Sequence, residues 1–217
     1  ILGNGIASGI GNASDNTLLG NSLANTLSGA AGADSLDGGD GADSLDGGAD
    51  NDTILGGLGN DTLNGGAGND SLLGGDGNDY YIIDSTSDVV SDTAGNDSLL
   101  AQFTDYTLGS GLEWLILDGT VAKGSGNASA NTLLGNASDN TLDGGAGNDS
   151  LAGGAGNDFY IVDSTSDVVS ENASSGTDSV LTSVTGVTLT SNVEWLILDG
   201  TTAAGTGNAS DNTIVGN

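Results

Sequence analysis

The chain has 217 residues, of which 30 are Asp or Glu, one is Lys or Arg and none is His, so its formal net charge is −29. The absence of Cys and His excludes disulfides, thiolate or imidazole metal sites and nucleophilic catalysis that depends on either residue. With Lys123 as its single base and no long apolar run, we expect neither a nucleic-acid partner nor membrane insertion.

So acidic a chain repels itself, and Leu, Ile, Val and Phe together make up only about 23% of it, just above the composition typical of disorder. Hydrophobic burial alone does not easily offset the entropy cost of folding. Two outcomes remain. Either the chain is disordered, or bound cations neutralise it and supply folding energy.

A nine-residue period divides the chain. The clearest units read GGDGADSLD, GGLGNDTLN and GGAGNDSLL, and the spacers between the arrays share DSTSDVVS and EWLILDGT. We expect, in chain order, an N-terminal segment (1–10), a first array of eight units (11–82), a β spacer (83–125), a second array of four units (126–161), a second β spacer (162–206) and a terminal unit (207–217).

Each unit consists of a turn, GGxGxD, and a short strand, xUx, in which U is a large apolar residue. Glycine permits positive φ and lets carbonyl groups turn inward, and Asp at position 6 supplies a carboxylate. Carbonyl and carboxylate oxygens are the ligands that Ca²⁺ prefers. One apolar residue in nine makes a core only if successive strands stack it into a ladder, as in a solenoid.

The units match GGxGxDxUx and resemble the RTX (hemolysin-type calcium-binding) repeat family. The resemblance implies a parallel β-roll, several Ca²⁺ ions and export from a Gram-negative bacterium to the extracellular space or cell surface. We therefore predict an all-β fold, a parallel β-solenoid with two nonapeptides per coil, in which the spacers continue as wider β coils.

The candidate calcium ligands are the aspartates at position 6 and the glycines at positions 2 and 4. They are Asp34, Asp43, Asp52, Asp61, Asp70, Asp79, Asp149 and Asp158, with Gly39, Gly41, Gly48, Gly57, Gly59, Gly66, Gly68, Gly75, Gly77, Gly145, Gly147, Gly154 and Gly156.

Two units per coil place each unit above the one two before it. Asp34, Asp52 and Asp70 should then line one edge, and the other three aspartates of the first array the opposite edge. The three stacked turns on each edge enclose two gaps. The two edges together therefore predict roughly four well-formed sites. Asp50 occupies position 4, where Gly is expected, and this weakens the case for calcium at its turn.

Asparagine replaces the position-6 aspartate in several units. In the second array, the stacked partners of Asp149 and Asp158 are Asn131 and Asn140, so we expect those sites to be weaker or absent. Units 11–19 and 20–28 carry Asn16 and Asn25 at this position and should form metal-free turns held by asparagine hydrogen bonds.

The spacers also predict strands, which we place at 80–84, 88–90, 98–101, 106–108 and 113–117. We expect Trp114 and Trp195 in the core of these strands, with a sugar-stacking pair as the alternative. Glu113 and Glu194 precede them and are interpreted as spacer calcium ligands or strand-end charges, with a catalytic carboxylate pair as the alternative. Lys123 should form a surface ion pair.

Three functions fit these features. The first is a calcium-stabilised extracellular structural protein that assembles head to tail into a filament, surface layer or matrix, because the chain opens and closes within repeat sequence without a polar cap. The second is a stiffening spacer of a large adhesin. The third is the non-catalytic portion of a secreted enzyme. We expect no catalysis from this segment, and we expect its partners to be copies of itself and cell-surface polysaccharide.

Overall fold

The computed structural model describes residues 3, 5, 7–201 and 204–216. The expected segment 1–10 and the terminal unit 207–217 therefore lie partly outside the described residues. Contacts divide the chain into two compact units. The first ends at Gln102 and includes Gly109–Leu112, and the second comprises Phe103–Leu108 and the chain from Glu113 onwards.

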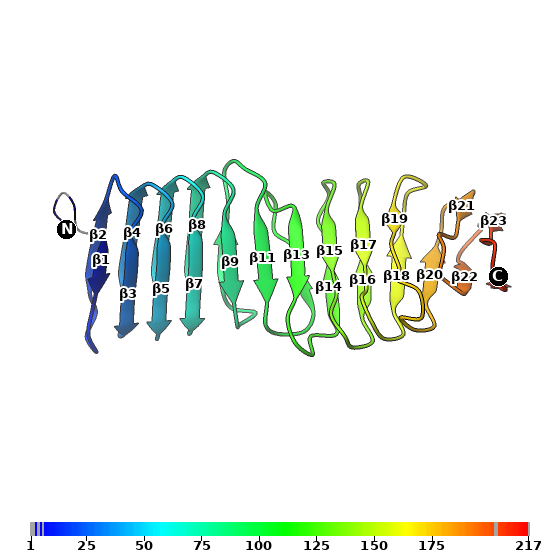
Figure 1. Ribbon diagram of the computed structural model, residues 1–217, viewed down its shortest axis with the longest axis horizontal. Helices are drawn as coiled ribbons and strands as arrows, with labels where there is room; N and C mark the ends of the chain where they lie inside the picture. The colour runs from blue at the N-terminus through cyan, green and yellow to red at the C-terminus, as the bar shows by residue number, and fades with distance from the viewer. Residues whose placement is uncertain (1–2, 4, 6, 202–203, 217) are drawn as a thin grey trace. The chain divides into compact units, whose positions relative to one another are not determined.

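The first unit is a parallel β-solenoid in which each xUx segment forms a strand (Figure 1). Partners along the stack lie two repeats apart in the sequence, as in Thr26↔Ser44 and Thr53↔Ser71, so two nonapeptides make one coil, as predicted. Its strands are β1 (Ser8–Ile10), β2 (Thr17–Asn21), β3 (Thr26–Ala31), β4 (Ser35–Asp40), β5 (Ser44–Ala49), β6 (Thr53–Leu58), β7 (Thr62–Ala67), β8 (Ser71–Asp76), β9 (Tyr80–Ile83), β10 (Val89–Ser91) and β11 (Ser98–Ala101).

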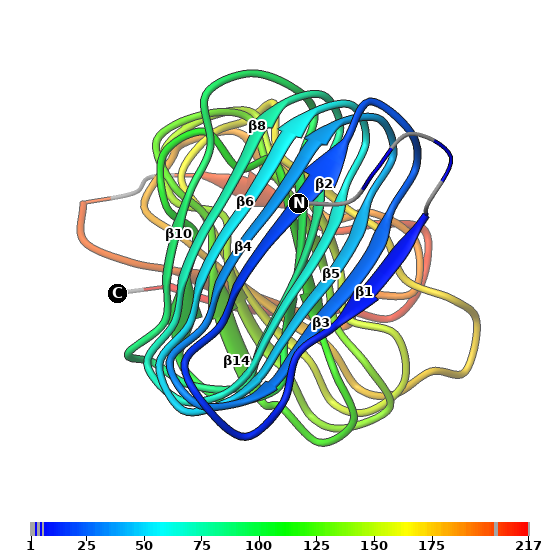
Figure 2. The same cartoon turned by 90° about the vertical axis from the view of Figure 1, so that its left-hand side faces the viewer.

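Two sheets of this unit face each other (Figure 2). One has the order β1-β3-β5-β7-β9-β11 and the other β10-β8-β6-β4-β2. Position 8 of each nonapeptide points inward. Stacked side chains such as Leu27, Leu45 and Leu63 pair directly across strands and are at most 1% exposed. The single apolar residue per unit thus forms the predicted core ladder.

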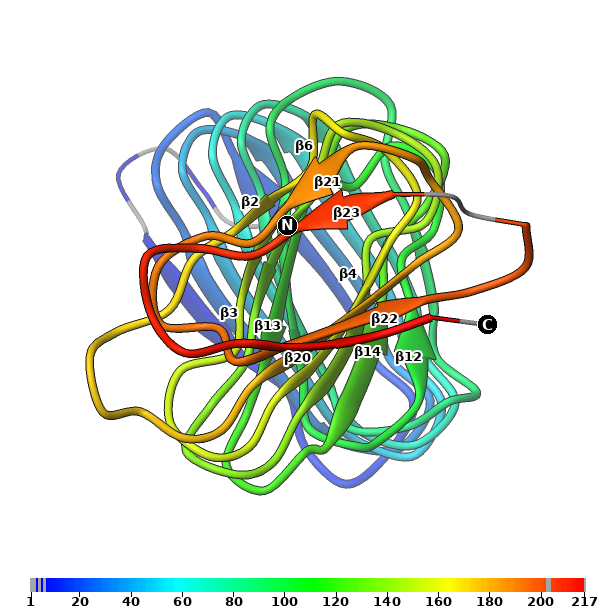
Figure 3. The same ribbon diagram turned by 90° about the vertical axis from the view of Figure 1, so that its right-hand side faces the viewer.

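The second unit repeats this construction. Its sheets have the orders β13-β15-β17-β19, β12-β14-β16-β18-β20-β22-β24 and β21-β23, and the last pair is visible in Figure 3. Its strands are β12 (Tyr106–Thr107), β13 (Trp114–Leu117), β14 (Lys123–Ser125), β15 (Thr132–Leu134), β16 (Thr141–Asp143), β17 (Ser150–Ala152), β18 (Phe159–Val162), β19 (Val168–Val169), β20 (Ser179–Thr182), β21 (Val187–Thr188), β22 (Trp195–Leu198), β23 (Gly205–Thr206) and β24 (Thr213–Val215).

The spacers continue the coil, as expected, but they are not uniformly wider. Most spacer strands keep the register of two repeats per coil, for example Tyr106↔Gly124 and Val187↔Gly205. The coil between Phe159 and its partner Ser179 is longer than two repeats, and the next one, between Ser179 and its partner Trp195, is shorter by the same amount. The second coil therefore restores the register that the first one shifts.

The prediction that both tryptophans lie in the core is wrong. Trp114 is 36% exposed and Trp195 is 39% exposed. Alternation along EWLIL turns Leu115 and Leu117 inward and leaves Trp114 on the outer face of β13. Trp195 lies in β22, which belongs to a different sheet, so the two residues do not form a sugar-stacking pair.

The turns need glycine where backbones approach closely. Gly57 has φ +116°, and a Cβ there would overlap the carbonyl oxygen of Gly39 in the neighbouring coil. Asp50 adopts φ +77° at its glycine position, so the turn forms there in spite of the substitution. In the described part of the chain, no helix is long and apolar enough to cross a membrane.

Candidate metal centre

The position-6 aspartates point into the turns and are almost fully buried. None of the eight predicted aspartates is more than 3% exposed. Burying an ionised carboxylate costs free energy unless a cation or hydrogen bonds compensate it. The surroundings of each oxygen therefore decide what the turn can hold.

One oxygen of each carboxylate belongs to a ladder along the edge of the coil. Asp52 Oδ1 accepts the backbone N–H of Asp34 at 2.8 Å, and Asp70 Oδ1 accepts that of Asp52 at 2.8 Å. On the opposite edge Asp61 Oδ1 accepts the N–H of Asp43 at 2.8 Å. The predicted stacking of aspartates on two edges is confirmed.

The second oxygen is buried and has no hydrogen-bond partner among the described residues. This holds for Oδ2 of all eight predicted aspartates. Oxygens of two coils converge beside it. A Cβ built on Gly56 would lie 2.5 Å from Asp61 Oδ2 and 2.6 Å from the carbonyl oxygen of Gly74. Buried carboxylate and carbonyl oxygens around so small a space are a donor set that fits Ca²⁺, and calcium binding by these residues stays a prediction.

The electrostatics of the turns also favour a bound cation. Burial, reinforced by neighbouring carboxylates, raises the pKa of Asp70, Asp79, Asp149 and Asp158 to about 6. Lys123 cannot relieve this, because it forms the predicted surface ion pair with Asp105 at 3.5 Å. No other Lys, Arg or His exists in the chain. A bound cation would remove the cost that burial imposes.

The predicted glycines have the conformation expected of such turns. All of them except Gly68 have positive φ. The sequence-based ligand set omitted the glycines at position 1, such as Gly56 and Gly74, which lie beside the orphan oxygens. Their signal was present in every GGxGxD string, whose first glycine stands at a fixed distance before the aspartate.

Four further aspartates in the spacers extend the ladders. In the first unit, Asp88 Oδ1 accepts the N–H of Asp70 at 3.1 Å, and Asp97 Oδ1 accepts that of Asp79 at 2.7 Å. Both residues continue the nine-residue spacing of Asp70 and Asp79. Their units were hard to recognise because positions 1–4, which read GGxG in the arrays, are IDST before Asp88 and DTAG before Asp97.

In the second unit, Asp149 and Asp158 also have carboxylate neighbours. Asp167 Oδ1 accepts the N–H of Asp149 at 3.0 Å, and Asp178 Oδ1 accepts that of Asp158 at 2.8 Å. The expectation of weak sites rested on asparagine partners alone, and it overlooked these carboxylates. Glu194 Oε2 in turn accepts the N–H of Asp178 at 2.8 Å, which places this glutamate in the ladder.

Side-chain hydrogen bonds hold the asparagine turns, as predicted. Asn16 Oδ1 accepts the N–H of Asn12 at 2.7 Å, and Asn25 Oδ1 accepts that of Asn21 at 2.8 Å. Asn140 adds a second bond, in which its Nδ2 donates to the carbonyl oxygen of Val121 at 3.0 Å. The amide supplies both an acceptor and a donor, and it brings no charge that requires a cation.

The family comparison agrees with this geometry. The family model of the RTX calcium-binding nonapeptide repeat matches the chain in four copies, at residues 10–45, 19–54, 46–81 and 125–160. No curated protein matches the chain. RTX repeats are typical of calcium-binding proteins secreted by Gram-negative bacteria. The matched residues are those of the two arrays, whose aspartates form the buried ladders. This chain therefore belongs to the RTX calcium-binding repeat family.

Proposed function

We propose that this chain is a calcium-stabilised extracellular structural protein whose copies assemble head to tail into a filament, surface layer or matrix. The observation that carries the calcium part is the set of buried Oδ2 atoms without partners, stacked from coil to coil. Such a chain is poorly stable without a cation and rigid with it, which suits a structural element that forms outside the cell.

The energetics favour a switch between compartments. Extracellular calcium modules bind with Kd of about 10⁻⁴–10⁻³ M, so at Kd of about 10⁻⁴ M, roughly 1 mM free calcium stabilises the fold by about 1.4 kcal/mol per site. Several sites together reach the roughly 5–15 kcal/mol typical of a folded domain. At low intracellular calcium this contribution vanishes, and the acidic chain stays unfolded and competent for secretion.

The assembly part rests on the repeating register. Interior strands such as β5 and β7 pair in parallel with strands of the coils before and after them. Within the described residues, β1 and β24 each pair on one side only, and the residues of β24 are exposed. A coil from a second copy would supply backbone N–H and C=O groups that pair with these edge strands.

Particle size tests the assembly. Light scattering at several protein concentrations should show growth in millimolar calcium that excess chelator reverses. Circular dichroism of the same samples should report the calcium-dependent gain of β structure. A calcium-folded monomer at every concentration would overturn head-to-tail assembly and favour the adhesin spacer. Hydrolysis by the purified chain would overturn a purely structural role.

A further inference from the structure

An acidic residue follows the last turn of each array, at a place where the repeat has glycine. Asp92 stands two repeats after Gly74, and Glu171 stands two repeats after Gly153. In the preceding coil of the same edge, the residue two repeats after Gly56 is a glycine, Gly74. The two positions are equivalent in the two arrays, although the acidic residue differs.

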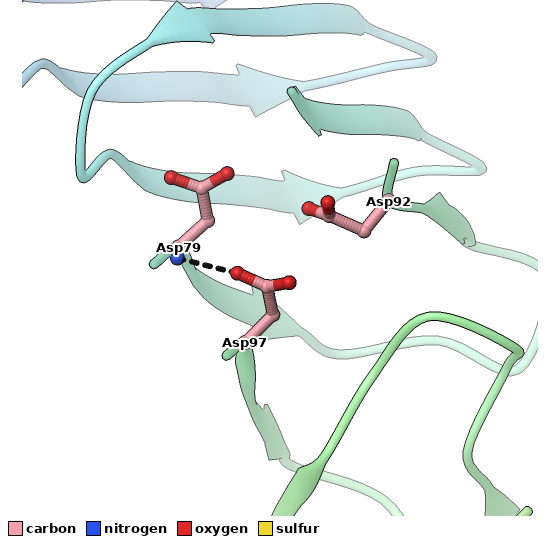
Figure 4. A group of neighbouring side chains, drawn as sticks. All are labelled: Asp79, Asp92 and Asp97. Atoms are coloured by element: carbon pink, nitrogen blue, oxygen red, sulfur yellow. Dashed lines mark hydrogen bonds between the residues drawn. The ribbon is translucent and has the colours of Figure 1, made fainter. Parts of the chain in front are cut away.

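These side chains bring a third carboxylate to the turn. Asp79, Asp92 and Asp97 place one oxygen each within 4.8 Å of one another. Figure 4 shows how the three side chains lie. Asp158, Glu171 and Asp178 form the corresponding group in the second unit. A Cβ built on Gly74 would lie 2.7 Å from Asp92 Oδ2, whereas one on Gly56 would lie 2.6 Å from a main-chain carbonyl oxygen. A charged oxygen thus stands where the array has a neutral one.

Buried oxygens without partners point into both groups. Asp79 is 2% exposed and its Oδ2 has no partner among the described residues. The same holds for the Oδ2 atoms of Asp158, 1% exposed, and Asp178, 0% exposed. No basic side chain compensates them, because the only one in the chain pairs with Asp105.

A buried tyrosine positions each additional carboxylate. Tyr81 and Tyr160 occupy position 8 of the last unit, where the other units have Leu or Ile, and both are 0% exposed. Their hydroxyl groups donate to Asp92 Oδ2 and Glu171 Oε1.

Each hydroxyl is itself fixed by a backbone group. The N–H of Gly74 donates to Tyr81 Oη at 2.7 Å, and that of Gly153 donates to Tyr160 Oη at 2.7 Å. The second oxygen of Glu171 accepts the hydroxyl of Ser175 at 2.8 Å. In the folded chain both carboxylates are therefore held beside the turn by protein contacts alone.

We propose that these two groups are additional calcium sites with three carboxylates each, and that they fill before the gaps between array coils. Calcium affinity rises with the number of charged ligands and the rigidity of the site. A net ligand charge of −3 also favours trivalent lanthanides over Ca²⁺. The inference rests on the calcium-dependent folding proposed above, and the following experiment separates the two.

The test compares the full chain with Asp92→Asn, Glu171→Gln and the double variant. Calcium would be titrated against a competing chelator to obtain ion counts and affinities, with circular dichroism to verify folding in millimolar calcium. Each single variant should lose one of the tightest ions or weaken it at least tenfold, and the double variant should lose two. Asp76→Asn, an exposed charge in the same turn as Asp79, is the matched control and should leave both tight ions in place.

Terbium supplies a second readout that does not depend on the acidic variants. Because Tyr81 and Tyr160 touch the proposed ligands, tyrosine-sensitised Tb³⁺ emission should appear with the first two equivalents and fall in Tyr81→Phe and Tyr160→Phe. Unchanged counts and affinities in the acidic variants, with emission independent of both tyrosines, would overturn the two sites and leave calcium-dependent folding intact. A wild-type chain that folds without binding calcium would overturn both proposals.

Discussion

Each position-6 aspartate divides its two carboxylate oxygens between two interactions. Asp61 Oδ1 accepts a backbone N–H from the coil before it, and Asp61 Oδ2 is buried beside the carbonyl oxygen of Gly74. The first interaction needs only an acceptor, whereas the second leaves a negative charge without a counter-ion. An asparagine amide can serve as the hydrogen-bond acceptor, but it cannot supply the negative charge.

Asp61→Asn should therefore raise the calcium concentration needed for folding. The residue stacks between Asp43 and Asp79, so the loss of its charge affects two gaps. We expect the midpoint of the calcium-dependent circular dichroism transition to rise about tenfold, equivalent to about 1.4 kcal/mol. Asp76→Asn removes an exposed charge and should raise this calcium midpoint much less. Equal shifts would mean that net charge, not the ladder, governs folding.

Acid should partly replace calcium. Burial raises the pKa of Asp70, Asp79, Asp149, Asp158 and Asp178 from 3.8 to about 6. The folded chain then binds more protons than the unfolded chain between these values, so without calcium its stability rises as the pH falls through 6 and levels off below about pH 4. In calcium-free buffer, circular dichroism should show more β structure at pH 4.5 than at pH 7.5. A pH-independent spectrum would contradict this.

At the scale of the turn, close stacking of backbones limits which residues fit. Gly57 and Gly186 both have positive φ, but a Cβ on Gly57 would overlap the carbonyl of Gly39, whereas nothing lies within 4 Å of one on Gly186. Gly186→Ala should cost about 1 kcal/mol from φ alone, and Gly57→Ala about 3 kcal/mol. Urea denaturation in saturating calcium measures both. Similar losses would show that φ strain, not coil stacking, sets the requirement.

The asparagine turns should be independent of calcium. Asn140→Asp replaces the Nδ2 donor to Val121 by a charged oxygen that faces the same carbonyl. We expect urea denaturation to show a loss of about 1–3 kcal/mol at a calcium concentration just sufficient for folding, and a smaller loss in saturating calcium. Asn172→Asp, at an exposed position, adds the same charge and should be nearly neutral. A loss of equal size in both variants would point to general repulsion.

The sequence predicted the elements that depend on local pattern and missed those that depend on stacking. The strand at 98–101 was predicted and is β11. The ladder roles of Asp88 and Asp97 were hidden, because their units lack the leading pair of glycines. Trp114 was misplaced because EWLIL is apolar at successive positions, and composition alone does not say which face the sheet buries.

Across the whole chain, the fold has to accommodate a net charge of −29 with one basic residue. The charges fall into two classes. Exposed acids such as Asp40 and Asp76 face water, and buried ones such as Asp61 and Asp70 line the ladders. Salt and calcium should act differently on these classes, because mobile ions screen exposed charges and hardly reach buried ones.

High salt should therefore fail to replace calcium. At about 1 M NaCl the Debye length is near 3 Å, so repulsion among exposed carboxylates is largely removed. The buried Oδ2 atoms still lack a ligand, and their desolvation cost persists. In chelator, circular dichroism should show little gain of β structure between about 0.01 and 1 M NaCl, whereas millimolar calcium at either salt concentration should fold the chain. Choline chloride, whose cation is too large for the turns, is the matched control. Folding in both salts without calcium would mean that long-range repulsion, not the empty ladders, keeps the chain unfolded.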